Sequence, residues 1–253
     1  MRRKSSANFN KYNGLHSNKH NFLIHLVIFA IKKRECMERK RWMLNLHEIL
    51  NSITHGIGVL LSIAGLVLLV VFASIRQPDA WKIVSFSVYG FSLILLFTAS
   101  TLYHSFQNKR IKEYLNIFDH ASIFILIAGT YTPFTLVSMR GPWGWSIFGV
   151  IWGLAIAGVV FKVFFYTHRM RFVGSMIYLA MGWIILIAIK PLLQSVPTGG
   201  LLWLLAGGLF YSVGIIFYLR TKKNQYNHVV WHLFVLAGAI SHFFSIFFYV
   251  LPA

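Results

Sequence analysis

Four side chains of the kinds that bind metal ions stand beside long apolar segments: His104, Asp119, His228 and His232. His228 and His232 are four residues apart, so a helix would place both imidazoles on one face, one turn apart. With His104 as a third nitrogen and Asp119 as an oxygen ligand or a water holder, the set matches catalytic zinc, which takes three protein ligands and keeps an open water position. Zinc is the expected metal, while iron, nickel and copper stay open because imidazole suits them too.

A structural interpretation competes with metal binding for each of these residues. A single histidine at the end of a membrane span is more often a hydrated interfacial side chain than a ligand. Four candidate ligands on three spans at one depth favour metal binding, because ionisable residues inside membranes are costly and usually functional. Ser100 lies four residues before His104, so its hydroxyl could bond a water or a substrate oxygen. A packing serine bonded to its own backbone is equally compatible with that spacing.

Three further ionisable residues fit the site less well. His242 lies ten residues beyond His232, about 15 Å along a helix, which is too far to share the ion, so we expect it to form a hydrogen bond inside the bundle. His120 points about 100° away from Asp119 and would support a ligand or lie on the surface. Lys162, near the end of a span, is expected to extend its ammonium group to the interface.

Membrane-spanning helices must position these residues. The 253 residues are 57% hydrophobic and 12% charged, whereas soluble domains are about 25% charged. Apolar stretches of roughly 20 residues, the length that crosses the hydrocarbon core, recur from residue 53 onward. The predicted fold is therefore an all-α membrane protein, a bundle of seven transmembrane helices. We expect the spans at 53–75, 81–103, 118–138, 143–166, 172–190, 199–219 and 229–251.

The distribution of basic residues predicts the orientation of the bundle. Lysines and arginines concentrate in the connectors 104–117, 167–171 and 220–227, while the other connectors and the C-terminal tail hold few. The positive-inside rule then places the N-terminus in the cytoplasm and the C-terminus outside. The net charge of +18 is explained by this topology, so no nucleic-acid partner is expected. All four candidate ligands would lie at the cytoplasmic ends of their spans.

The sequence divides into a basic cytoplasmic segment, residues 1–47, and a membrane domain, residues 48–253. The apolar run at 22–31 is too short to span a bilayer. It could form an interfacial helix, or the stretch before Met37 or Met43 could come from an upstream start codon that the cell does not use, which is the alternative we favour.

Several motifs together resemble the haemolysin III branch of the progestin and adipoQ receptor family. They are Glu48-Ile-Leu-Asn51-Ser-Ile-Thr54-His55-Gly56, Ser100-Thr-Leu-Tyr-His104, Asp119-His120 followed by Ile127-Ala-Gly-Thr-Tyr-Thr-Pro133-Phe134, and His228-Val-Val-Trp-His232 with His242 beyond. The resemblance covers about residues 46–253 and implies a multi-pass protein of the bacterial cell membrane. It also implies a zinc ion near the cytoplasmic face, held by His104, His228 and His232, with Asp119 holding a zinc-bound water.

The resemblance extends to alkaline ceramidases, which suggests a zinc-dependent hydrolase acting on the amides or esters of membrane lipids, involved in membrane homeostasis. Asp119 would then be the general base and Ser100 a donor to the oxyanion or the water. A non-enzymatic sensor of membrane state with structural zinc is the first alternative. Cytolysis is the second, although a basic seven-span protein is an unusual secreted toxin. The substrate, the oligomeric state and the catalytic or structural role of zinc stay open.

Overall fold

A computed structural model describes the backbone of residues 5–76, 78–165 and 170–252, and the side chains of these residues apart from 5–27 and 38–45. The chain divides into two compact units, an N-terminal unit, Met1–Leu46, and a unit that we call the membrane unit, His47–Ala253. Of the predicted basic segment, residues 1–4 lie outside the described residues, as does Arg169 of one basic connector.

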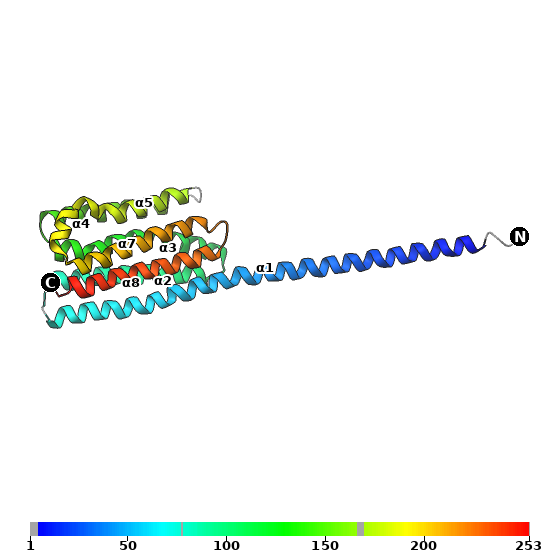
Figure 1. Ribbon diagram of the computed structural model, residues 1–253, viewed down its shortest axis with the longest axis horizontal. Helices are drawn as coiled ribbons and strands as arrows, with labels where there is room; N and C mark the ends of the chain where they lie inside the picture. The colour runs from blue at the N-terminus through cyan, green and yellow to red at the C-terminus, as the bar shows by residue number, and fades with distance from the viewer. Residues whose placement is uncertain (1–4, 77, 166–169, 253) are drawn as a thin grey trace. The chain divides into compact units, whose positions relative to one another are not determined.

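The described residues form helices joined by short connectors (Figure 1). Seven helical segments among them are long and apolar enough to cross a membrane, the first at Leu46–Arg76 and the last at Tyr226–Val250. This confirms the predicted all-α, seven-span fold. The helices are α1 (Ser5–Arg76), α2 (Ala80–Ser105), α3 (Lys109–Pro133), α4 (Pro142–Phe164), α5 (Arg171–Trp183), α6 (Ile189–Ser195), α7 (Thr198–Arg220) and α8 (Tyr226–Ser245), with π-helical turns η1 (Phe134–Ser138) and η4 (Ile246–Val250) and the 3-10 turn η3 (Ile184–Ala188).

The third helix begins nine residues before the predicted start of its span. Asn108 caps this helix, because its side-chain oxygen accepts hydrogen bonds from the amides of Arg110 and Ile111. The polar first turns of α3 carry Lys112, which the apolar pattern alone did not place in the helix. This extension has a functional consequence, because it brings a lysine to the candidate site.

Tyr131 stabilises an irregular stretch in the fifth span. The α-helix changes there to η3 just before Pro191, a residue that has no amide hydrogen and crowds the carbonyl four residues earlier. Tyr131 Oη donates to the carbonyls of Met181 and Gly182 at 2.9 and 2.8 Å and accepts from the amide of Ile185 at 3.0 Å. Backbone groups freed inside a membrane protein must be satisfied in this way by neighbouring helices.

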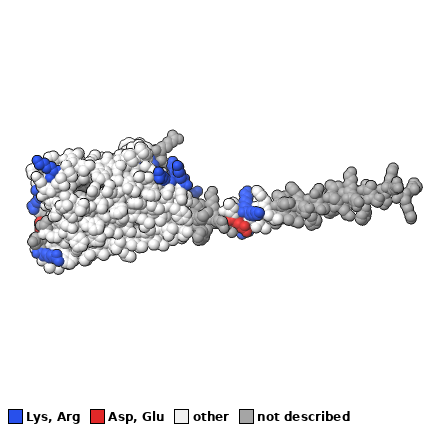
Figure 2. All heavy atoms as spheres, in the orientation of Figure 1, with Lys and Arg blue, Asp and Glu red and all other residues white. Residues whose placement is uncertain are grey.

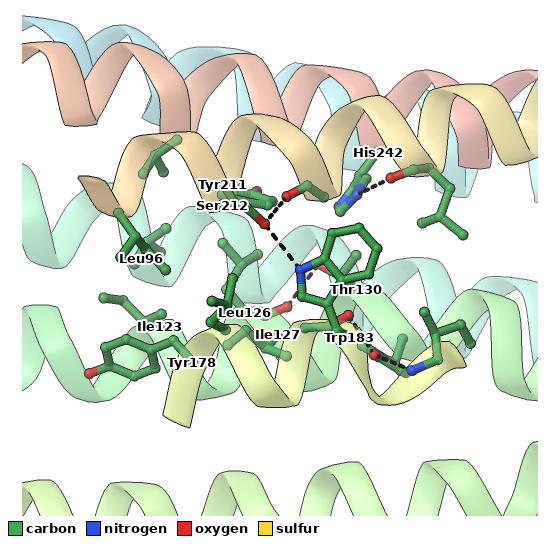
Figure 3. Close-up of a pocket in the computed structure, with 18 of the residues that line it drawn as sticks. Leu96, Ile123, Leu126, Ile127, Thr130, Tyr178, Trp183, Tyr211, Ser212 and His242 are labelled. Carbon is green, nitrogen blue, oxygen red and sulfur yellow. Dashed lines mark hydrogen bonds between the residues drawn. The ribbon is translucent and has the colours of Figure 1, made fainter. Parts of the chain in front are cut away.

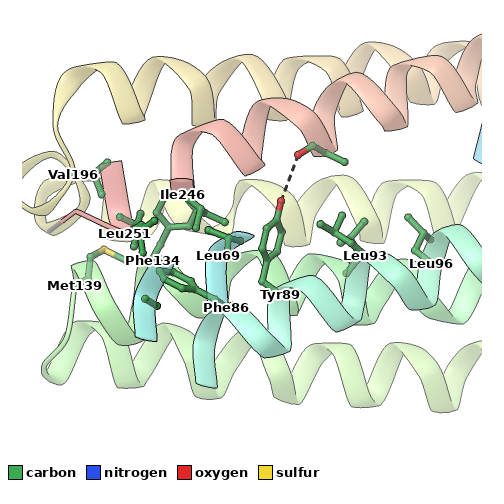
Figure 4. Packing of buried hydrophobic residues seen from close by; sticks show 14 of the residues in the cluster. Leu69, Phe86, Tyr89, Leu93, Leu96, Phe134, Met139, Val196, Ile246 and Leu251 are labelled. Atoms are coloured by element: carbon green, nitrogen blue, oxygen red, sulfur yellow. Dashed lines mark hydrogen bonds between the residues drawn. The ribbon is translucent and has the colours of Figure 1, made fainter. Parts of the chain in front are cut away.

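Buried apolar side chains from α1, α2, α8 and the π-helical turns form a core toward the end of the bundle where the chain ends (Figure 4). Tyr89 crosses this core, and its Oη donates to the Ala239 carbonyl of α8 at 3.4 Å. Close packing also fixes α7 against α8, because Gly214 leaves room for the ring of Trp231. The packing of α7 fixes the position of α8, the helix that carries His228 and His232.

Charged side chains keep to the two ends of the membrane unit, and the face shown in Figure 2 carries an uncharged belt between them. This belt is the surface expected against the hydrocarbon core. One end has the exposed basic residues Lys109, Arg110, Arg220, Lys222 and Lys223, and the other has Arg76, Arg140 and Lys190. The orientation toward the cytoplasm stays a prediction.

Candidate metal centre

Three histidines from two helices meet at the end of the membrane unit that carries Arg220 and Lys222. His104 comes from the last turn of α2, and His228 and His232 come from the first turns of α8. One potential ligand atom from each lies within 4.8 Å of the others, which is close enough to hold one metal ion. His104 and His232 are 3% and 1% exposed, so bulk water solvates neither ring. The predicted convergence of these three residues is therefore found.

A carboxylate fixes the ring of His104. Glu48 Oε2, from the first turn of α1 in the membrane unit, lies 2.6 Å from His104 Nδ1, and Lys112 Nζ donates to Glu48 Oε1 at 2.8 Å. Because an ionised carboxylate only accepts, His104 Nδ1 carries the proton and Nε2 presents its lone pair. Nε2 is buried and has no hydrogen-bond partner among the described residues. This buried lone pair is the form in which an imidazole can bind a metal ion.

The backbone of α1 orients His232 in the same way. His232 Nδ1 lies 3.3 Å from the carbonyl oxygen of Asn51, which can only accept, so this nitrogen donates and Nε2 is left as the potential ligand. The ring of His55 stacks on His232 with centroids 3.6 Å apart and planes at 12°. His55 is 3% exposed, and neither of its ring nitrogens bonds to any side chain or backbone group in the described part of the chain.

Asp119 and Ser100 lie beside the histidines without joining the group of three. Asp119 is buried on α3, where His104 and Lys162 are its electrostatic partners. Ser100 Oγ faces the Asp119 carboxylate, although within the described residues it has no partner at normal hydrogen-bond distance and angle. Both side chains line the same cavity as His228 and His232. A water or a substrate group in this cavity would reach them.

The structure confirms the prediction for His242 and differs from the prediction for Lys162. His242 forms the interior hydrogen bond that we expected, from Nε2 to the carbonyl of Leu204 at 3.1 Å. His120 is not on the surface: it is 9% exposed, and its Nε2 accepts from Tyr218 Oη at 2.8 Å. The prediction for Lys162 was wrong, because this side chain is 2% exposed. It turns into the bundle, where Asp119 is an electrostatic partner.

A cavity of about 320 Å³ joins the histidines to the interior of the bundle. His55, Ser100, Asp119, His228 and His232 line it at one end. Its walls are otherwise almost entirely apolar and come from α2, α3, α5, η3, α6, α7 and α8, as far as Phe134 and Leu201. Figure 3 shows part of this lining. From Asp119 on α3 to Phe134, the first residue of η1, the lining covers about 22 Å at ~1.5 Å per residue. A polar chamber therefore continues into a long apolar one.

Sequence reasoning missed the roles of Glu48, Asn51 and His55. All three lie on one face of α1, because they are spaced three and then four residues apart. A glutamate, an asparagine and a histidine on one face at the start of an apolar span are a detectable signal. What the spacing could not reveal is that this face turns toward His104 and His232.

Comparison with known proteins gives the family of this chain. A family model for haemolysin-III-related proteins matches residues 43–243. Hemolysin-3 of Bacillus cereus is 49% identical over 205 residues, covering 81% of this chain and 92% of the relative. The Hemolysin-3 homolog of Bacillus subtilis is 48% identical over 202 residues, covering 80% and 93%. The human monocyte to macrophage differentiation factor is 28% identical over 205 residues, covering 79% and 83%.

The fold and the cluster define a class of protein: a multi-pass membrane protein with three histidines, close enough to hold a metal ion, at one end of a seven-helix bundle. Within that class, this chain belongs to the haemolysin III family, the bacterial branch of the progestin and adipoQ receptor proteins. It is accordingly a protein of the cell membrane.

Proposed function

We propose that this protein is a zinc-dependent hydrolase of lipid amides or esters, with its site at the cytoplasmic face of the membrane. The observation that carries the proposal is a cavity that His228, His232, Asp119 and Ser100 line at one end and that continues as a long apolar chamber. A polar reaction centre at the end of an apolar chamber suits a molecule with one polar linkage and a hydrocarbon chain.

The residues at the site fit a zinc ion. Zinc takes imidazole nitrogens, and its catalytic sites use three protein ligands. His104, His228 and His232 would hold it, since their ligand atoms lie within 4.8 Å of one another and Nε2 of His104 is buried without a partner in the described structure. The Glu48 carboxylate that holds His104 Nδ1 is the second partner that metal-binding histidines usually have.

Zinc bound here would supply Lewis acidity, polarising the carbonyl group and lowering the pKa of water toward neutrality. The chain's own residues would perform the remaining tasks. Asp119 would accept the proton of the attacking water and pass it to the leaving amine or alcohol. Ser100 Oγ, which faces Asp119 and lines the cavity, would donate to the carbonyl oxygen once the Asp119 carboxylate has taken up the proton of the water.

The apolar part of the cavity would hold the acyl chain. Leu96, Ile123, Leu126 and Ile127 line it next to the polar end (Figure 3). Burial of a hydrocarbon chain there contributes about 0.8 kcal/mol per methylene group, which would hold the cleaved bond at the polar end. The expected products are a fatty acid and an amine or alcohol.

Fatty-acid release by the purified full-length protein tests this proposal. A panel of ceramides, N-acyl amines and glycerol esters would be incubated with protein loaded with zinc and with protein stripped by a chelator. Release of fatty acid from at least one lipid, dependent on zinc, is the expected result. Zinc-independent release, or no release from any lipid of the panel, would refute the hydrolase.

Glu48→Gln should weaken metal binding without changing the ligands. The amide cannot hold the His104 ring as a carboxylate does, and loss of such a partner usually lowers metal affinity about 10–100-fold. Zinc affinity would be measured by competition with a chromophoric chelator. Glu113→Gln is the matched control, because Glu113 is an exposed glutamate on α3. Equal affinities for the two variants would show that Glu48 does not position the ligand.

Structural zinc is the second candidate, and the interactions across several helices favour it. His104 of α2, His228 and His232 of α8, Glu48 of α1 and Lys112 of α3 form one connected group. An ion at its centre would hold four helices together in a protein that senses or adjusts membrane state.

Metal removal should therefore lower the Tm under either proposal. At a free zinc concentration near a thousand times its Kd, binding stabilises the folded state by about 4 kcal/mol. For a chain of this size the Tm would fall by about 8–16 °C on chelation. Thermal unfolding in detergent, with and without a chelator, measures the effect. An unchanged Tm would contradict structural zinc, whereas a lower Tm without fatty-acid release would favour it over the hydrolase.

A further inference from the structure

Two polar side chains interrupt the apolar walls of the cavity well away from the histidine cluster. Tyr211 of α7 and His242 of α8 both line the cavity (Figure 3). Their ring centroids are 5.5 Å apart. His242 lies ten residues beyond His232 on the same helix, which is about 15 Å along the axis. The pair therefore lies deep in the bundle, about 15 Å from His232.

Both side chains have an unsatisfied polar atom. His242 Nε2 donates to the Leu204 carbonyl at 3.1 Å, so Nδ1 carries the lone pair and can only accept. Nδ1 of His242 and Oη of Tyr211 are buried, and neither has a hydrogen-bond partner within the described structure. One group is thus an acceptor, and the other can both donate and accept.

Ser212 and Thr130, which line the apolar part of the cavity, have their hydrogen bonds satisfied. Ser212 Oγ accepts from Trp183 Nε1 at 3.1 Å and donates to the Gly208 carbonyl at 2.7 Å. Thr130 Oγ1 donates to the Leu126 carbonyl at 2.8 Å. Because a buried polar atom without a partner costs free energy, native proteins keep few of them. The unsatisfied pair therefore indicates a missing hydrogen-bonding group in the cavity.

We propose that Tyr211 and His242 form a hydroxyl-recognition subsite, and that the ligand of this cavity is an acyl chain with a hydroxyl group part-way along its length. The ligand hydroxyl donates to His242 Nδ1 and accepts from Tyr211 Oη. The inference rests on the proposed lipid hydrolase, because it names the kind of chain that the same cavity takes. It narrows the substrate class from any acyl lipid to hydroxyacyl lipids.

Binding of two matched fatty acids tests the subsite. Ricinoleate and oleate differ only by a hydroxyl group part-way along the chain, and neither is cleaved by a hydrolase, so the measurement is independent of turnover. Radiolabelled tracer binding to the full-length protein in detergent gives both affinities. We expect ricinoleate to bind about tenfold more tightly than oleate, because one well-placed buried hydrogen-bonding group contributes about that gain in affinity.

Tyr211→Phe should reduce this preference to about twofold or less, with oleate affinity kept, because only one hydroxyl is removed. Tyr249→Phe is the matched control: Tyr249 is a half-buried tyrosine of η4 and is not a lining residue of the cavity. This variant should keep the wild-type preference. The Tm of Tyr211→Phe should match wild type, since its hydroxyl bonds to no described residue in the free protein.

Each outcome bears on a single claim. Equal affinities for the two acids, binding of neither, or a preference that survives Tyr211→Phe would overturn the subsite, and equal affinities would mean that a buried water satisfies the pair. Zinc-dependent release of fatty acid without a preference for the hydroxylated chain would support the hydrolase and refute the subsite. A preference for ricinoleate without zinc-dependent release of fatty acid would support the subsite and refute the hydrolase.

Discussion

His228→Ala protein is expected to purify almost free of metal, while the wild type holds about one zinc ion per chain. The binding free energy of structural zinc, about 10–16 kcal/mol, is shared by some four ligands, so each ligand contributes about 2.5–4 kcal/mol. Loss of one then lowers the affinity about a hundred- to a thousandfold. Metal analysis of the purified protein measures this directly, and His232→Ala should behave in the same way.

His242→Gln is the matched control for metal content. His242 is also a buried histidine of α8, but its Nε2 already bonds to the backbone and it lies outside the group of three. Its variant should keep the wild-type metal content. If His228→Ala, His232→Ala and wild type contained equal metal, these histidines could not be the ligands.

Asp119→Asn should abolish fatty-acid release and leave zinc in place. An amide cannot accept the proton of the attacking water, and loss of a general base usually lowers the rate about 10²–10⁴-fold. Because Asp119 is outside the group of three histidines, the metal content should stay near wild type. The rate of release and the metal content, measured on one preparation, separate a catalytic role from a ligand role.

Asp79→Asn provides the control for the loss of a carboxylate. Asp79 caps α2 by accepting from the amide of Trp81, and asparagine caps helices about as well as aspartate. This variant should keep both activity and metal. If Asp119→Asn lost its zinc together with its activity, Asp119 would be a ligand rather than the base.

The histidine cluster could be predicted because it follows from topology. Two residues four apart on one helix share a face, and the count of spans places His104 at the same end as His228. The interactions of Glu48 with His104 and Lys112 could not be predicted in this way. They depend on the rotation of α1 and on the early start of α3, which are set by packing between helices.

Lys162 is a second residue whose side-chain direction could not be predicted from the sequence. Its place near the end of α4 fits a side chain that extends to the interface, yet the packed bundle buries it near Asp119. Hydropathy gives the depth of a residue in a membrane but not the direction in which it points. The cavity was also beyond prediction, since its walls combine residues of α2, α3, α5, η3, α6, α7 and α8.

His228, His232, Asp119 and Ser100 all line the cavity at the end where the three histidines meet. Lipids present their polar linkages at the headgroup level, so only one leaflet can deliver a linkage to these residues. A lipid in the opposite leaflet would first have to flip across the bilayer. The protein would thus act on the composition of a single monolayer, and its turnover would report how lipids are distributed between the two.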